Sequence, residues 1–94
     1  MLIEIKDQVA VVTGASRGIG YAACVALAKE GVHIAATARN EEQLGDLVAQ
    51  CQAHGVKAIA YPADATDATA VYALRDRVLS DFGKVDILVN NAGV

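Results

Sequence analysis

The sequence has few aromatic residues, almost no proline and no excess of basic residues. Its 94 residues include no tryptophan, one phenylalanine and one proline, and the net charge is −3. The pI is near 5.1 and no basic stripe is present, so we expect no nucleic-acid partner. No apolar run is long enough to span a membrane, and the charged segment 1–8 lacks the apolar core of a signal peptide. These absences predict a cytoplasmic protein that does not contact membranes.

Cysteine and histidine are also scarce. Cys24 and Cys51 have no metal-ligand spacing around them and fall on apolar helix faces, so we expect buried structural thiols. His33 and His54 have no partner at catalytic or metal-binding spacing, so we expect surface or loop-end histidines and no metal site. By contrast, 54% of the residues are hydrophobic, which predicts a folded chain, and the length allows one domain at most, residues 1–94.

What the sequence does contain is an alternation of strand and helix patterns. Short apolar runs predict strands at residues 9–12, 33–38, 57–61 and 85–89. The first predicted helix covers residues 18–30 and ends at Gly31. The second follows Asn40 as N-cap, with Gln43 as its reciprocal partner, and closes at Gly55. The third follows Thr66 or Asp67 and stops at Gly83.

Apolar residues at helical spacing predict which face of each helix is buried. The expected residues are Ile19, Ala22, Ala23, Ala26 and Leu27 in the first helix, Leu44, Leu47, Val48 and Cys51 in the second, and Val71, Leu74, Val78 and Phe82 in the third.

The order βαβαβαβ predicts an α/β fold with a parallel sheet and right-handed crossovers. We expect the first half of a Rossmann-like, doubly wound sheet with strand order 3-2-1-4, the first two helices on one face and the third on the other. The fourth strand then lies at an edge, and Asp86 is its only charge. Because such an edge is poorly protected against pairing, we expect a homo-oligomer formed through the fourth strand or the sheet face beside it.

A glycine-rich loop, residues 13–20 (TGASRGIG), joins the first strand to the first helix. Gly14 allows a tight turn, Gly18 lets a ligand approach the backbone, and Gly20 lets the helix pack closely on the sheet. Backbone N–H groups around Gly18 and Ile19 can donate to a pyrophosphate. A tight turn that binds nothing is the alternative.

These residues resemble the short-chain dehydrogenase/reductase family. Residues 13–20 are similar to the family's glycine motif, and residues 90–93 (NNAG) are similar to its second signature. Asp64 resembles the acidic residue that members place against the adenine ring. The three matches occur in the expected order, and the likeness covers the whole chain but only the first third of a typical member. Among members, it is similar to NADP-dependent 3-oxoacyl-carrier-protein reductases and related carbonyl reductases.

The resemblance implies roles for individual residues. Those expected around the cofactor's phosphates and adenosine ribose are Gly14, Ser16, Gly18, Ile19 and Gly20. Asp64 would bind the adenine amino group and the Ala65 N–H a ring nitrogen, although Asp64 is otherwise an ordinary turn carboxylate. Asn90, Ala92 and Gly93 would flank the riboses, and Asn90 could instead, or also, tie neighbouring strands together.

The end of the second strand predicts NADP(H) rather than NAD(H). NAD enzymes usually place a carboxylate there, which binds the ribose 2′-hydroxyl. This sequence has Ala38 at that position, followed by Arg39 and Asn40, and Arg17 lies in the glycine loop. Guanidinium groups match phosphate oxygens, so we expect Arg17 and Arg39 to bracket a 2′-phosphate. Two solvated surface arginines are the alternative.

No catalytic residues are predicted within these 94 residues. Family members use a Tyr as general acid/base with a Lys four residues later, but Tyr21, Tyr61 and Tyr72 are followed at that spacing by valine, alanine and aspartate. We therefore expect the cofactor-binding half of an oxidoreductase acting on carbonyls or alcohols, with the catalytic half absent and the chain alone inactive. The alternatives are a nucleotide-binding module without chemistry and a self-assembling fragment that binds nothing.

Overall fold

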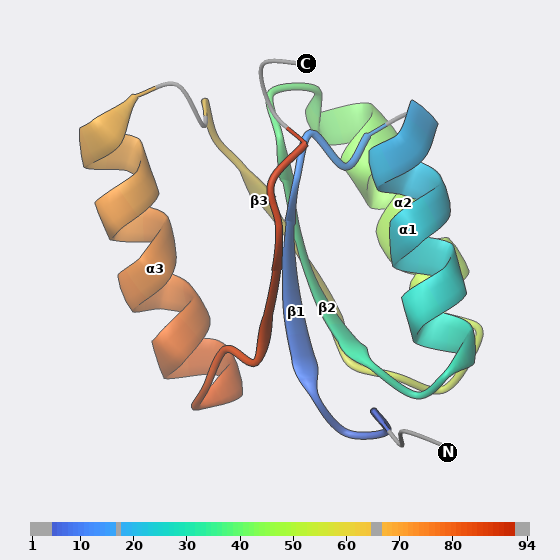
Figure 1. Cartoon of the computed structure of the whole chain (residues 1–94). Helices are drawn as coiled ribbons and strands as arrows, with labels where there is room; N and C mark the ends of the chain where they lie inside the picture. Colours follow the sequence, from blue (N-terminus) through green and yellow to red (C-terminus); the bar gives the residue numbers. More distant parts are fainter. Residues whose placement is uncertain (1–4, 17, 65–66, 92–94) are drawn as a thin grey trace.

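The computed structural model describes residues 5–16, 18–64 and 67–91, which form a four-stranded parallel sheet between helices (Figure 1). The elements are β1 (Val9–Thr13), α1 (Gly18–Lys29), β2 (His33–Ala38), α2 (Glu41–Gln52), β3 (Ala58–Pro62), α3 (Ala68–Phe82) and β4 (Ile87–Val89). The strand order is β3-β2-β1-β4, and each neighbouring pair is parallel. The predicted Rossmann-like fold and strand order are confirmed.

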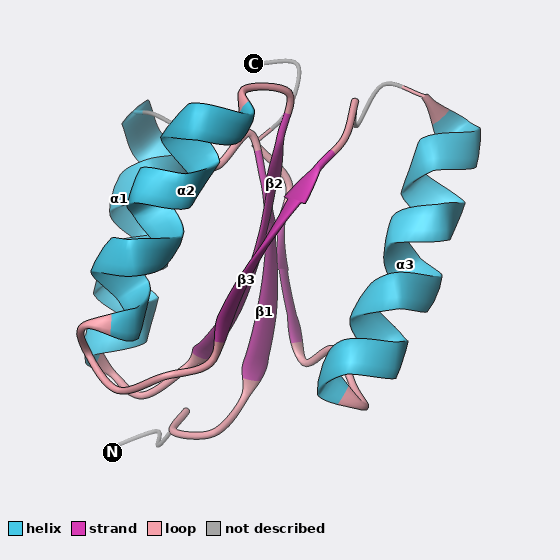
Figure 2. Cartoon of the chain, turned by 180° about the vertical axis from the view of Figure 1, so that it is seen from behind, coloured by secondary structure: helices cyan, strands magenta, loops and turns pink. Residues whose placement is uncertain are grey.

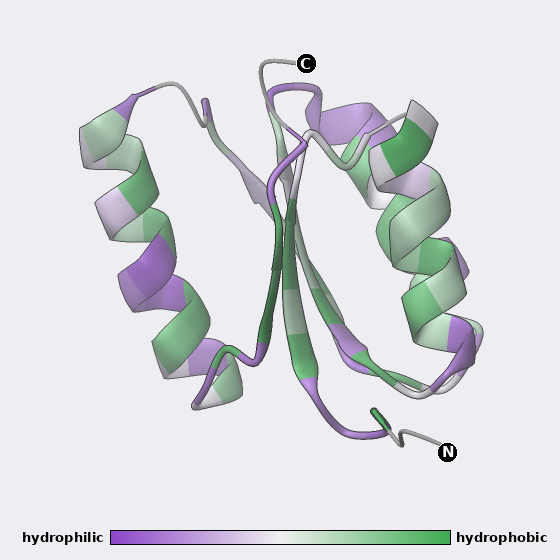
Figure 3. Cartoon of the chain, viewed as in Figure 1, coloured by the Kyte–Doolittle hydropathy of each residue, from purple (hydrophilic) through white to green (hydrophobic). Residues whose placement is uncertain are grey.

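The helices form two layers around the sheet. Figures 1 and 2 show α1 and α2 on one face and α3 alone on the other, as the crossover pattern predicts. Figure 3 shows hydrophobic residues along the strands between the helix layers and hydrophilic residues concentrated in the loops, whereas α1 is hydrophobic along most of its length. The core between the sheet and α1 and α2 is the larger of the two. The core under α3 consists of Val11, Ala35, Tyr61, Leu74 and Val78, with Ile59 and Phe82 packed against it.

The predicted buried face of α1 is wrong at three of its five residues. Ile19 is 75% exposed and Ala22 and Ala26 are also exposed, whereas Gly20, Cys24 and Ala28 are buried. Ala23 is half-buried, and Leu27 packs against the core as predicted. The helix is apolar on nearly every side, so periodicity could not select one face. Close packing at Gly20 selected it, because a Cβ there would lie 2.4 Å from the Gly14 carbonyl oxygen.

The α2 face is confirmed, since Leu44, Leu47 and Cys51 are buried and Val48 is packed against the same core. In α3, Leu74 and Val78 are buried and Phe82 is partly buried, as predicted. Val71 lies on the same helix face but is 39% exposed. It lies in the first turn of α3, where the helix extends beyond the buried contact made by the middle turns.

Strand boundaries differ from the predictions mainly at the fourth strand. It begins at Ile87 rather than Val85, because Asp86 caps the end of the pairing with β1. Its carboxylate accepts a hydrogen bond from the Val9 N–H at 2.8 Å, and its own N–H donates to the Val9 carbonyl. The third strand lies one residue later than predicted and includes Pro62, which is tolerated because β3 is an edge strand.

The helix caps follow the sequence signals. Asn40 Oδ1 accepts from Gln43 N at 2.9 Å, and Asp67 Oδ1 accepts from Thr69 N at 2.9 Å. The predicted helix-terminating glycines all have positive φ. Thr66, the alternative cap of α3, lies outside the described residues.

No helix in the described part of the chain is long and apolar enough to cross a membrane.

Both cysteines are buried in the core beside α1 and α2, as predicted. Burial, with a smaller contribution from Cys51, raises the pKa of the Cys24 thiol to about 12. Because the thiolate is the reactive form, this thiol is a poor nucleophile.

His33 lies at the start of β2, and His54 is exposed after α2. Residues 5–16, 18–64 and 67–91 hold no cluster of three or more potential metal ligands.

Candidate cofactor site

The carboxyl ends of the four strands meet at one edge of the sheet. Figure 1 shows that α1 begins at this same edge, directly after β1, and that α2 begins there after β2. In open parallel α/β sheets, ligands bind at the carboxyl ends of the strands, at the point where the strand order reverses. Here that point lies between β1 and β4, because the chain first adds strands on one side of β1 and then on the other.

The glycine loop leaves open space at the start of α1. Gly18, the first residue of the helix, has φ +63°, a conformation that other residues rarely adopt, and a Cβ built on it meets no atom within 4 Å. Ala15 holds the loop against the sheet, because its side chain is buried and its N–H donates to the Thr37 carbonyl at 3.1 Å. Ser16 is half-buried and Ile19 is exposed beside the opening.

This geometry fits an anionic ligand such as a pyrophosphate. The first N–H groups of an α-helix have no acceptor within the helix, and the helix dipole favours negative charge at that end. The open space over Gly18 lets a phosphate approach these groups, while Gly20 holds the helix close to Gly14. The described residues of the loop therefore have the shape and polarity of a phosphate-binding turn.

Thr13 ties the glycine loop to the segment after β4. Its hydroxyl oxygen accepts from Asn91 N at 2.8 Å and lies 3.1 Å from Asn90 Oδ1. Asn91 then donates through Nδ2 to the Gly14 carbonyl at 3.3 Å. These bonds fix the two segments that border the opening relative to each other.

Thr13 and Asn91 lie within the two sequence motifs but were not predicted as site residues. A usable signal was present, because a threonine at the last position of a buried apolar strand needs a hydrogen-bond partner. The contact between Asn90 Oδ1 and the Thr13 hydroxyl supports a structural role for Asn90. The role of Asn90 at a ribose stays a prediction, and Ala92 and Gly93 lie outside the described residues.

The ends of β2 and β3 carry the other predicted residues. Arg39 is exposed immediately after β2, and the Ala38 carbonyl accepts from Ala63 N at 3.0 Å. Asp64 is half-buried two residues after β3, and its carbonyl accepts from Asp67 N. The topology thus places both residues at the edge that holds the glycine loop.

Three further predicted cofactor contacts involve Asn40, Arg17 and Ala65. Asn40 Oδ1 caps α2, which accounts for this side chain without a cofactor contact. Arg17 and Ala65 lie outside the described residues, so their predicted contacts with a 2′-phosphate and with adenine stay predictions.

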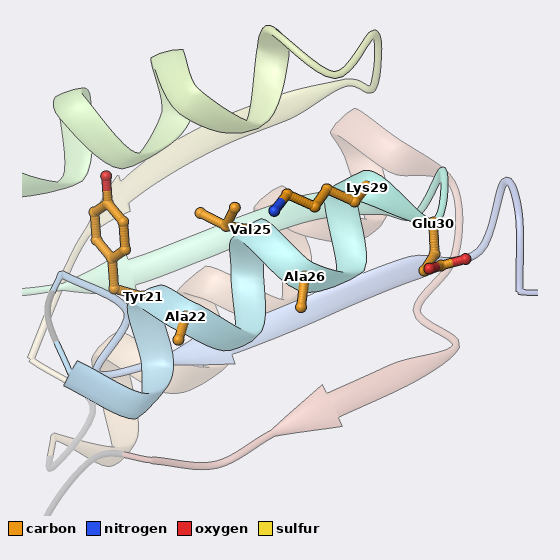
Figure 4. A pocket seen from close by; sticks show the side chains of 6 residues that line it. All are labelled: Tyr21, Ala22, Val25, Ala26, Lys29 and Glu30. Carbon is orange, nitrogen blue, oxygen red and sulfur yellow. The ribbon is translucent and has the colours of Figure 1, made fainter.

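A second hollow lies along α1, away from the strand ends. Figure 4 shows its lining, which consists of Tyr21, Ala22, Val25, Ala26, Lys29 and Glu30. All six side chains come from one helix and its end, and none was predicted to contact cofactor. This shallow feature does not compete with the glycine loop as the cofactor site.

Comparison with known proteins agrees with this geometry. The family model described as short chain dehydrogenase matches residues 8–94. The 2,3-dihydro-2,3-dihydroxybenzoate dehydrogenase of Bacillus subtilis strain 168 is 43% identical over 96% of this chain and 34% of its own length. A 3-oxoacyl-[acyl-carrier-protein] reductase of Staphylococcus aureus is 44% identical over 90% of this chain and 35% of its length.

Solved structures share both fold and sequence with the chain. L-sorbose reductase from Gluconobacter frateurii, crystallised with NADPH and L-sorbose, superposes with a TM-score of 0.93 at 40% identity, covering 100% of this chain and 36% of that one. NAD+-bound xylitol dehydrogenase gives a TM-score of 0.93 at 41% identity, covering 98% and 35%.

The chain spans about a third of the length of the curated relatives it matches. Within that span, the strand order, the glycine loop and the match over residues 8–94 agree. The chain belongs to the short-chain dehydrogenase family.

Proposed function

We propose that the chain forms the NADP(H)-binding part of an oxidoreductase that transfers hydride between the nicotinamide and a carbonyl or alcohol substrate. The observation that carries the proposal is the open space over Gly18 at the start of α1, on the same sheet edge as Arg39. The bound cofactor supplies or accepts the hydride. The residues of this chain bind and orient it.

Each part of the site has a separate task in this proposal. The backbone at the start of α1 holds the pyrophosphate, and the Asp64 carboxylate accepts a hydrogen bond from the adenine amino group. Arg39, together with Arg17, binds the 2′-phosphate. Ala38 replaces the carboxylate that would repel this phosphate, so the local charge favours NADPH over NADH.

The named relatives do not decide between the two cofactors. One similar structure was solved with NADPH and another with NAD+. The preference therefore rests on the charge at the end of β2. No Tyr-x-x-x-Lys occurs in the sequence, so we further propose that the proton donor lies outside these 94 residues and that the chain alone binds cofactor without turnover.

Calorimetric titration with NADPH and NADH tests the proposal. We expect NADPH to bind more tightly by roughly ten- to a hundredfold, on the order of 1.5–3 kcal/mol for a charge-assisted phosphate contact. Arg39→Asp should abolish or reverse this preference. Arg75→Asp makes the same charge change at an exposed site on α3, across the sheet from α2, and should leave it intact. Equal affinities for the two cofactors in the unchanged chain would contradict the proposed preference.

A further inference from the structure

Three hydroxyl-bearing residues form one row across the sheet, just before the loops of the site. The strand register aligns Thr13 in β1 with Thr37 in β2, and Thr37 with Tyr61 in β3. All three are buried. Thr13 is the first residue of the glycine loop, Thr37 lies two residues before Arg39, and Tyr61 lies three residues before Asp64.

Thr37, in the middle of this row, contacts the segments on both sides. Its hydroxyl donates to the Tyr61 carbonyl at 2.7 Å, and its own carbonyl accepts from Ala15 N at 3.1 Å. One fully buried residue therefore joins the glycine loop to the end of β3.

The hydroxyl of Thr37 adds a side-chain bond near the end of the pairing between β2 and β3. The last pair of these strands is Ala38 with Pro62, and the bond from Ala63 N to the Ala38 carbonyl closes the main-chain ladder. The side-chain bond from Thr37 to the Tyr61 carbonyl lies one residue before this last pair. A valine would fill the same space, so packing alone does not account for a buried hydroxyl here.

We infer that Thr37 is a positioning residue, whose hydroxyl fixes the end of β2 with Arg39 relative to the end of β3 with Asp64 and so shapes the adenosine end of the cofactor site. The inference rests on the proposed function. A ligand that spans these two strand ends, with a phosphate at one and an adenine at the other, is sensitive to their spacing, because small displacements of binding groups weaken binding.

The probe is 2′,5′-ADP, which carries the adenine and the 2′-phosphate without the nicotinamide half. Calorimetric affinity and melting temperature are measured for the unchanged chain, Thr37→Val, Thr37→Ala and Thr37→Ser. Valine keeps the volume and loses the hydroxyl, while serine keeps the hydroxyl and loses the methyl group. Alanine is a second hydroxyl-free variant, so the comparison stands if valine is not accommodated.

We expect Thr37→Val and Thr37→Ala to weaken 2′,5′-ADP binding about five- to tenfold and Thr37→Ser by no more than about twofold, although all three lower the melting temperature. Tyr61→Phe is the matched control. It removes the phenol hydroxyl but keeps the main-chain carbonyl that Thr37 contacts, so it should lower stability and preserve affinity.

Three outcomes would overturn the inference, and the last is distinguishable from the first two. Affinities that follow melting temperature across all four variants, or that are equal in Thr37→Val and the unchanged chain, would leave Thr37 with a structural role only. Failure of the unchanged chain to bind 2′,5′-ADP would overturn the proposed function and the inference with it.

Discussion

The phenol hydroxyl of Tyr61 donates a 2.6 Å hydrogen bond to Asp81 Oδ2, which joins β3 to the last turns of α3. The tyrosine is 1% exposed, the Arg77 guanidinium lies over its ring, and Lys57 Nζ donates to the main-chain carbonyl of Asp81. Burial, followed by the hydrogen bond and charge of Asp81, raises the pKa of Tyr61 above its ordinary value.

This pKa shift predicts a loss of stability in alkaline solution. The folded state favours the neutral phenol, so its contribution is complete below the ordinary tyrosine pKa near 10 and falls as pH rises above it. Urea unfolding between pH 7 and 11 should show this decline. Tyr61→Phe should cost about 1–2 kcal/mol at pH 7 and decline less steeply above pH 10. Tyr72→Phe, at a 60% exposed position, should follow the unchanged chain. Parallel curves for Tyr61→Phe and the unchanged chain would contradict the assignment.

Two glycine-to-alanine substitutions should have opposite effects. A Cβ at Gly20 would lie 2.4 Å from the Gly14 oxygen and 2.9 Å from Asn91 Nδ2, so Gly20→Ala should move α1 away from the loop and lower both stability and nucleotide affinity. Gly45 lies within α2 with no atom within 4 Å of the added Cβ. Gly45→Ala should therefore stabilise the chain by about 0.5–1 kcal/mol. Thermal unfolding measures the stability of both variants. An unchanged stability of Gly20→Ala would show that the helix can shift without cost.

Asp86 should contribute to stability except in acid. Its hydrogen bond from Val9 N, followed by the bond from Lys84, lowers the pKa of its carboxyl. A lowered pKa means that the contribution is present above the ordinary value near 4 and is lost as pH falls through the folded-state pKa. Asp86→Asn should reduce stability at pH 7 and flatten its decline below pH 4, as measured by urea unfolding. Asp46→Asn, at an exposed position of α2, serves as the control. The same acid profile in both variants would count against this role.

The edge strand β4 should promote self-association. Leu88 is 65% exposed at the centre of this strand and is aligned with Val11, which belongs to the core under α3. We expect dimers or larger species in light scattering at low micromolar concentration, because an apolar edge strand can pair with its symmetry mate. Leu88→Lys should shift the chain toward monomer, whereas Leu79→Lys on α3 should do so less. A monomeric unchanged chain would show that an edge strand of three residues is too short to pair.

The sheet edge that carries the candidate cofactor site could be predicted from sequence because its signals are local. These signals depend on residues close together in the chain. They are the turn at Gly14, the helix caps Asn40 and Asp67, and the apolar runs of the strands. The crossover rule then leaves few topologies for βαβαβαβ, and the order β3-β2-β1-β4 is among them.

By itself, the sequence determined the element order, the position of the glycine loop and the family. The tertiary structure alone decided which face of α1 is buried, where β4 begins, and which side chains hold the strand ends together. The contacts of Asp86 with Val9 and of Thr37 with Tyr61 join neighbouring strands. The contact of Gly20 with Gly14 depends on how closely α1 packs against the loop that precedes it. Periodicity reports only local preference, so a helix that is apolar on nearly every side or a hydroxyl at a strand end acquires its partner only when the elements pack.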